Sequence, residues 1–93
     1  MIIHMSIHTP RPGKEEDLIA SMHRFGAAGA GQQGFIEGLV LRDTRSGRLV
    51  GVARWEDEAS WRAGVEVMRA VVADDPFDEW EEGDTVGFFL EEV

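Results

Sequence analysis

The chain has 93 residues, of which 43% are hydrophobic and 29% charged, and this composition is typical of a soluble globular protein with a single domain over residues 1–93. Its net charge of −9 would repel nucleic acid and anionic membrane surfaces, so we expect neither as a partner. The absence of cysteine excludes disulfides, thiolate metal sites and cysteine nucleophiles.

The first predicted element is a strand over Ile2–His8, because apolar and polar side chains alternate strictly along it. One side carries Ile3, Met5 and Ile7, and the other carries a polar row of His4, Ser6 and His8. A helix follows over about residues 14–28. Its first turn is acidic and its apolar residues recur at helical spacing, as in an amphipathic helix packed on a core.

The second half of the chain predicts a hairpin, a helix and a last strand. "GFIEGLVLRD" and "GRLVGVARW" indicate an antiparallel hairpin from Phe35 to Trp55. Asp57 is the predicted N-cap of the next helix, which ends before Pro76. "DPFDEWEEGD" is expected to form a turn or irregular helix before the strand "TVGFFLEEV". The order predicts an α+β, ferredoxin-like βαββαβ fold, with two helices on one face of a four-stranded antiparallel sheet.

The other face of this sheet is not suited to water. Apolar residues occupy both parities of the predicted strands, with Phe35, Leu39 and Leu41 on one and Ile36 and Val40 on the other. A chain of this length has no third layer to cover the second face. We therefore expect a homodimer through the sheet face.

Residues 29–34, "GAGQQG", match the spacing of a dinucleotide-binding loop. Phosphate binding requires a strand before the glycines and a helix after them, and here the predicted order is reversed. We interpret the segment as the end of a helix and a flexible connector, with Gly29 or Gly31 in the left-handed conformation and Gly34 easing entry into the next strand.

Histidines and hydroxyls are the groups left for chemistry. His4 and His8 lie about 13 Å apart along an extended strand, too far to share one ion, and no metal site is predicted. His23, beside the apolar stripe of the first helix, is a further candidate at the edge of a cleft. No serine stands in a setting that indicates nucleophilic hydrolysis, so that reaction class is set aside.

The acidic run over residues 74–84 is interpreted as a solvated surface. No apolar run is long enough to cross a bilayer, and the first residues lack the features of a signal peptide. The expected location is the cytoplasm.

Three segments, "PGKEEDLIASM", "GFIEGLVLRD" and "ARWEDEASWRAGVEVM", resemble the antibiotic biosynthesis monooxygenase superfamily of dimeric α/β barrels. The resemblance extends from about Ile2 to Met68. It implies that two ferredoxin-like sheets pack into a barrel and that each subunit keeps a pocket between sheet and helices. Several members oxidise polycyclic phenols with molecular oxygen and no cofactor, and a sister branch degrades haem.

The functional residues of the haem-degrading branch are missing. The resemblance aligns Ser6 with its pocket asparagine, Gly64 with its tryptophan, and a position near Asp74 with its axial histidine. Haem degradation is therefore not expected, and no cofactor is predicted. The same alignment places the polar row of the first strand on the pocket side and gives Trp55 a structural position.

Two functions remain open. The first is a cofactor-independent monooxygenase acting on a small aromatic or quinol metabolite, with His4, His8 or His23 as the base and Ser6 as a hydrogen-bond donor. The pocket would be bounded by Met22, Phe25, Trp61 and Met68, with Trp61 as a stacking wall. The alternative is a non-catalytic, small-molecule-binding or regulatory barrel, which a pocket filled by those side chains would favour. Isomerase or decarboxylase chemistry on the same barrel is a third option.

Overall fold

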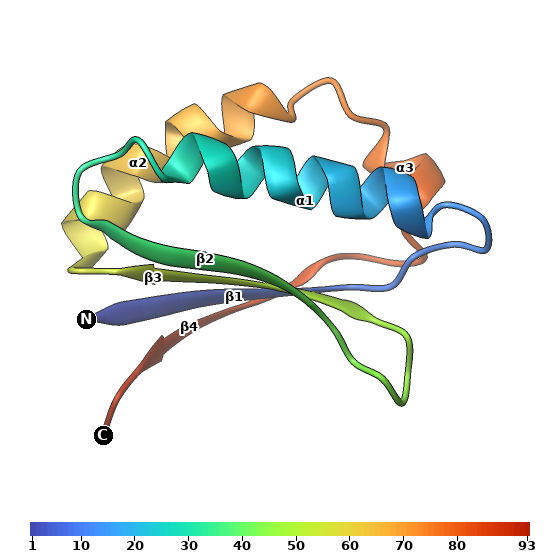
Figure 1. Ribbon diagram of the computed structural model, residues 1–93, viewed down its shortest axis with the longest axis horizontal. Coiled ribbons are helices and arrows are strands. Elements are labelled where there is room, and N and C mark those ends of the chain that lie inside the picture. The colour runs from blue at the N-terminus through green and yellow to red at the C-terminus, as the bar shows by residue number, and fades with distance from the viewer.

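The computed structural model describes all 93 residues as a sheet covered on one face by helices (Figure 1). The antiparallel sheet has the order β2-β3-β1-β4. Its strands are β1 (Ile2–His8), β2 (Phe35–Arg42), β3 (Leu49–Trp55) and β4 (Val86–Glu91). The helices are α1 (Glu15–Gly29), α2 (Glu58–Val71) and the short α3 (Phe77–Trp80). The predicted ferredoxin-like fold is confirmed, and none of the helices has the length and apolar character to span a membrane.

The helix starts follow the local chemistry of the chain. Asp57 caps α2, because its carboxylate accepts a hydrogen bond from the backbone N–H of Ser60 at 2.8 Å. α1 has no side-chain cap, but Glu15, Glu16 and Asp17 place negative charge in its first turn, where the helix dipole favours it.

The glycine-rich segment after α1 differs from the expectation in one respect. Neither Gly29 nor Gly31 is left-handed; the positive φ in this segment, 83°, is at Gly34. Gly29 is still helical and is buried against α2, where a Cβ would lie 2.8 Å from Met68 Cε and 2.9 Å from Phe35 Cε2. The helix therefore continues to Gly29 because a small residue is needed for packing, and the chain reverses at Gly34 on entering β2.

The alternation of β2 is broken by an irregularity in its pairing with β3 between Phe35 and Glu37. Phe35 packs with the helix-side core, edge-on to Trp55 at 5.1 Å between ring centroids. Leu39 lies opposite Val52 and faces away from the helices. Simple alternation predicts that Phe35 and Leu39 lie on the same face of the sheet. They lie on opposite faces, because a bulge inserts an extra residue between them.

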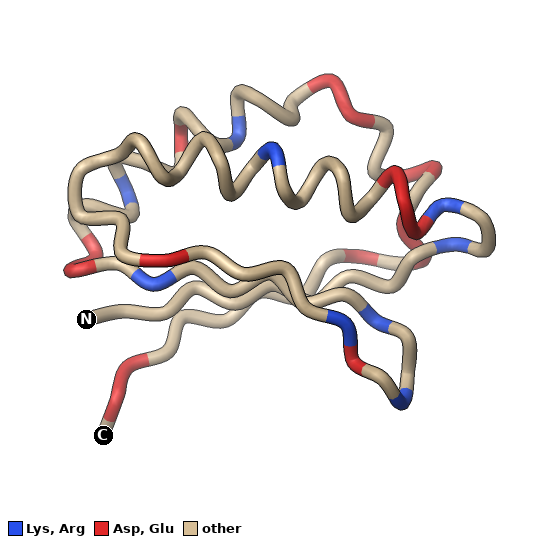
Figure 2. The backbone as a smooth tube through the Cα atoms, viewed as in Figure 1, with Lys and Arg blue, Asp and Glu red and all other residues tan.

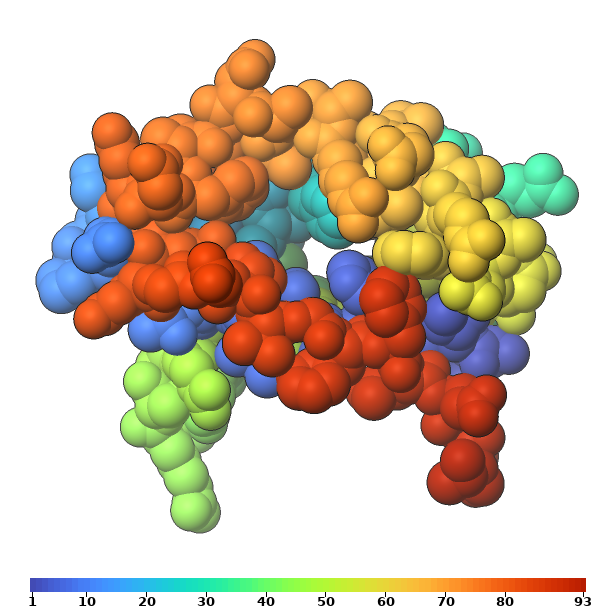
Figure 3. Space-filling view, turned by 180° about the vertical axis from the view of Figure 1, so that it is seen from behind, coloured from blue at the N-terminus to red at the C-terminus, as the bar shows by residue number.

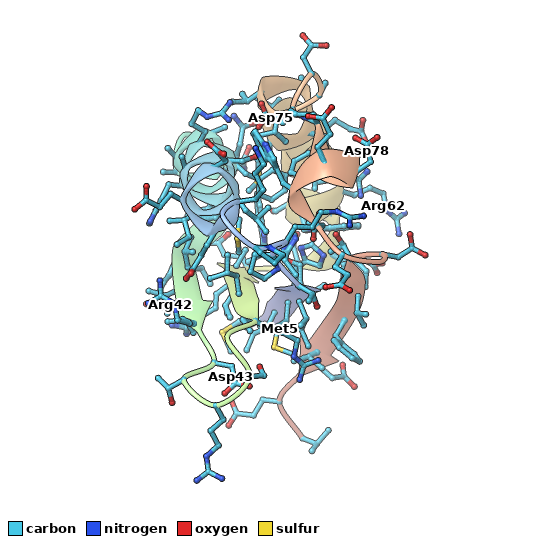
Figure 4. The ribbon with its side chains drawn as sticks, turned by 90° about the vertical axis from the view of Figure 1, so that its right-hand side faces the viewer. Met5, Arg42, Asp43, Arg62, Asp75 and Asp78 are labelled. Atoms are coloured by element: carbon cyan, nitrogen blue, oxygen red, sulfur yellow. The ribbon has the colours of Figure 1, made fainter.

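The face of the sheet away from the helices is apolar and open. The middle of all four strands carries no charged residue (Figure 2), and Met5 lies on this side (Figure 4). Leu39, Leu41, Val86, Phe88 and Leu90 are all at least 40% exposed here. We call this surface the outer face; it is made by Ile3, Met5, Ile7, Leu39, Leu41, Val50, Val52, Val86, Phe88 and Leu90.

The core between sheet and helices consists of two separate clusters. One contains Leu18, Met22 and Leu49, and the other contains Ala53, Trp55 and Met68. Hydrogen bonds of Asp75 connect α1 to the segment after α2. The Asp75 carboxylate accepts from Ser21 Oγ and Arg24 Nη2, both at 2.6 Å (Figure 4).

Candidate active site

A cavity of about 940 Å³ lies between the sheet and the two long helices. The polar row of β1 forms part of its floor, and Met22, Phe25 and Met68 line it from the helices. Figure 3 shows a hollow between β4 and α2 on this side of the molecule. The helix side chains thus leave room for a small molecule and do not fill the space between sheet and helices.

The most buried charged group of the cavity is Glu81, 6% exposed. Its Oε1 lies 2.6 Å from His8 Nδ1, and the other ring nitrogen, Nε2, lies 2.9 Å from Ser6 Oγ. Thr85 Oγ1 donates to the same carboxylate at 3.0 Å. A carboxylate only accepts hydrogen bonds, so Nδ1 of His8 carries a proton; in the neutral imidazole Nε2 is then the acceptor and the Ser6 hydroxyl donates to it. Carboxylate, imidazole and hydroxyl form one chain that ends in the cavity.

Two backbone hydrogen bonds hold Glu81 beside the end of β1. The Arg11 N–H donates to the Trp80 carbonyl at 2.8 Å, and the Glu82 N–H donates to the Thr9 carbonyl at 2.7 Å. The side chain of Glu81 is thereby placed against His8. The interpretation of the acidic run as a solvated surface is wrong for Glu81, because this backbone pairing buries one acid of the run and no periodicity marks it.

Ser6 has no sequence motif of a serine hydrolase around it, but the tertiary structure joins its hydroxyl to an imidazole and a carboxylate. His8 and Glu81 are 73 positions apart, and the serine that completes the chain precedes the histidine by two positions on a strand. The sequence motifs of serine hydrolases do not cover this arrangement. The only available signal was the i, i+2 spacing of Ser6 and His8, which puts both side chains on one face of β1.

His4, at the other end of the polar row, has an aromatic environment. Its ring stacks on Phe89 with centroids 4.9 Å apart and is tilted against Trp61 at 5.7 Å. Burial, and to a smaller extent the positive charge of Arg69, lowers the pKa of His4 below its ordinary value of 6.5. His4 is therefore neutral at pH 7, with one ring N–H and one lone pair.

We expect an NMR titration of the His4 ring protons to give a midpoint below pH 6.5. Because the folded pKa is lower than the unfolded one, the stability contributed by neutral His4 is present above pH 6.5 and is lost as the pH falls through the folded pKa. A His4→Phe variant keeps the ring stacking and should lack this part of the pH dependence in urea unfolding. A midpoint at or above 6.5 would contradict the assignment.

Two predicted site residues occupy other positions. His23 is exposed on α1 and reaches only the rim of the cavity. Trp61 does not line the cavity; Phe89 meets its ring edge to face at 4.5 Å, and His4 lies beside it. Its expected role as a stacking wall for a substrate is therefore wrong, because these two rings fill the space beside the indole.

The family model described as antibiotic biosynthesis monooxygenase matches residues 1–66. The chain belongs to this family. Two solved structures have the same fold over almost the whole chain. Rv0793 from Mycobacterium tuberculosis has a TM-score of 0.79 at 14% identity, covering 99% of this chain and 94% of its own. SnoaB from Streptomyces nogalater, a cofactor-independent oxygenase solved as a mutant, has a TM-score of 0.77 at 16% identity, covering 98% and 91%. No curated protein matches the sequence.

A third structural relative is a mutant of MhuD, solved with two manganese protoporphyrin IX molecules per active site. It has a TM-score of 0.80 at 18% identity and covers 100% of this chain and 95% of its own. In the present chain a Cβ at Gly64 on α2 would lie 2.5 Å from Trp55 Cη2, so this position has no room for a larger side chain.

Proposed function

We propose that this member of the antibiotic biosynthesis monooxygenase family is a cofactor-independent oxygenase that oxidises a small aromatic phenol or quinol in the cavity. The observation that carries the proposal is a histidine base, His8, held by a buried carboxylate and facing an apolar cavity large enough for a bicyclic substrate. Family membership supports the reaction class. The apolar side chains Met22, Phe25 and Met68 fit the flat faces of an aromatic ring.

The chemistry requires only a base, an apolar site and molecular oxygen. His8, acting through the Ser6 hydroxyl, takes the phenolic proton, and the electron-rich phenolate then reduces oxygen directly. One oxygen atom becomes a ring carbonyl and the other leaves as water, so a phenol and oxygen give a quinone and water. Glu81 keeps the His8 proton on Nδ1 and stabilises the imidazolium that forms.

Oxygen uptake tests this assignment. With 1-naphthol as substrate, His8→Ala should lower kcat/KM by about 10²-fold or more, the usual contribution of a positioned base. The His23→Ala control should keep its rate, because His23 is exposed at the rim. Unchanged uptake by the double variant His4→Ala, His8→Ala would overturn the proposal. Ligand binding without any turnover in the native protein would instead support the non-catalytic barrel.

We further propose that the working form is a homodimer in which two outer faces pack together. Large apolar side chains on β2 and β4 are at least 40% exposed on the outer face, as is typical of an interface, and the resemblance implies the same association. The cytoplasmic location of the protein stays a prediction.

A further inference from the structure

The hydrogen-bond chain of the cavity ends in a serine hydroxyl, and such a hydroxyl can act as a nucleophile as well as pass on a proton. Glu81 is almost fully buried, the side chain of His8 is 12% exposed, and the two hydrogen bonds of the imidazole, 2.6 and 2.9 Å, join a carboxylate to one ring nitrogen and a hydroxyl to the other. This order of acid, base and hydroxyl raises the nucleophilicity of a serine, because the imidazole removes the hydroxyl proton as the oxygen attacks.

The surroundings of Ser6 leave its hydroxyl accessible. Both residues paired with Ser6 across the sheet are glycines, Gly51 on β3 and Gly87 on β4, and all three line the cavity. A Cβ on Gly51 would lie 2.9 Å from Ser6 Oγ. Met22 Cε would lie 3.4 Å from the same Cβ and so covers the Gly51 side, whereas a Cβ on Gly87 would meet only His4 Nε2, at 4.0 Å; an acyl group therefore has its approach to the hydroxyl on the Gly87 side.

We propose that the same cavity holds a serine esterase activity that hydrolyses small aryl esters, independently of the oxygenase function. Ser6 is the nucleophile, His8 the base and Glu81 the positioning residue. The apolar helix side chains accept the aryl group of the ester, while the acyl carbon lies over the glycine-flanked hydroxyl.

The reaction balances with water as the only co-reactant. Ser6 Oγ bonds to the acyl carbon while its proton moves to His8 Nε2, and the carbonyl electron pair moves to oxygen. When the carbonyl re-forms, the bond to the phenol oxygen breaks and His8 returns the proton to that oxygen. Water then attacks the acyl-serine in the same way, which releases the carboxylic acid and restores Ser6.

His4 is the donor for the oxyanion. It lies two residues along the polar row from Ser6, and its Nε2 is 4.0 Å from the place that a Cβ on Gly87, the partner of Ser6 on β4, would occupy. The ring lines the cavity, and a neutral imidazole carries one N–H that can donate to an oxyanion.

Hydrolysis of p-nitrophenyl acetate under argon, followed by release of p-nitrophenolate, tests the proposal on the full chain. Hydrolysis needs no oxygen, so its rate in air should equal its rate under argon. If only the oxygenase function failed, oxygen uptake would be absent while hydrolysis continued. We expect Ser6→Ala to lower kcat/KM by about 10³-fold. Ser46→Ala is the control. The Ser46 hydroxyl also donates to a carboxylate, that of Asp43, but it lies in the β2–β3 turn outside the cavity. This variant should keep the native rate of hydrolysis.

Two further measurements separate a nucleophilic serine from a structural one. Glu81→Gln preserves the size of the side chain and should lower kcat by about 10²-fold or more while KM changes little. A fluorophosphonate, which phosphonylates an activated serine with loss of fluoride, should label the peptide that contains Ser6, and His8→Ala should abolish the labelling. The proposal would be overturned if Ser6→Ala hydrolysed the ester at the native rate, if the label were found on another residue, or if the native protein did not hydrolyse the ester.

Discussion

Replacing Trp55 by alanine is expected to destabilise the protein by about 3–5 kcal/mol, the usual cost of deleting a large buried aromatic side chain. Trp55 is completely buried at the end of β3, where it contacts Phe35 edge-on and belongs to the cluster with Ala53 and Met68. Urea unfolding followed by circular dichroism measures the loss. Trp80→Ala, at a half-buried site on α3, should cost clearly less, and a similar loss for both variants would contradict the assignment of Trp55 to the core.

The same site gives a sharper test through Gly64 on α2. A Cβ there would lie 2.5 Å from Trp55 Cη2 and 2.8 Å from Cζ3, so Gly64→Ala should cost about 1–3 kcal/mol by overpacking. Trp55→Phe removes both ring atoms, and in that background the added methyl should cost much less. Gly26→Ala is the matched control, because a Cβ on this α1 glycine meets nothing within 4 Å and should raise stability by about 0.5–1 kcal/mol.

A charge on the outer face is expected to split the proposed dimer. Phe88 and Leu39, 41% and 44% exposed, lie on different strands of this face, and an aspartate at either place would be buried against the partner's apolar strip without a counter-charge. Phe88→Asp should raise the dimer dissociation constant at least about 30-fold, equivalent to roughly 2 kcal/mol. Sedimentation equilibrium measures the change.

The control for this experiment is Val67→Asp, because Val67 is 46% exposed but stands on α2, in the helix layer. It should remain dimeric. The proposal of a sheet-to-sheet dimer would fail if the native protein sedimented as a monomer at micromolar concentration, or if both aspartate variants dissociated equally.

Much of the fold could be predicted because its signals are local. The alternation of Ile2–His8, the cap at Asp57 and the apolar spacing of α1 each depend on residues within a few positions of one another. The polar row of β1 could be found in the same way, since alternate side chains of a strand share a face. The bulge in β2 could not, because it depends on how two strands pair.

The sequence by itself determined the element order, the polar row and the apolar second face of the sheet. Only the tertiary structure decided what surrounds the row. Glu81 reaches His8 because backbone pairing between the segment after β1 and the end of α3 brings together residues 73 positions apart. The ring of Phe89, on the last strand, packs against Trp61, and Trp61 does not line the cavity. Contacts of this kind depend on the path of the whole chain, whereas periodicity records only which face each residue shares with its near neighbours.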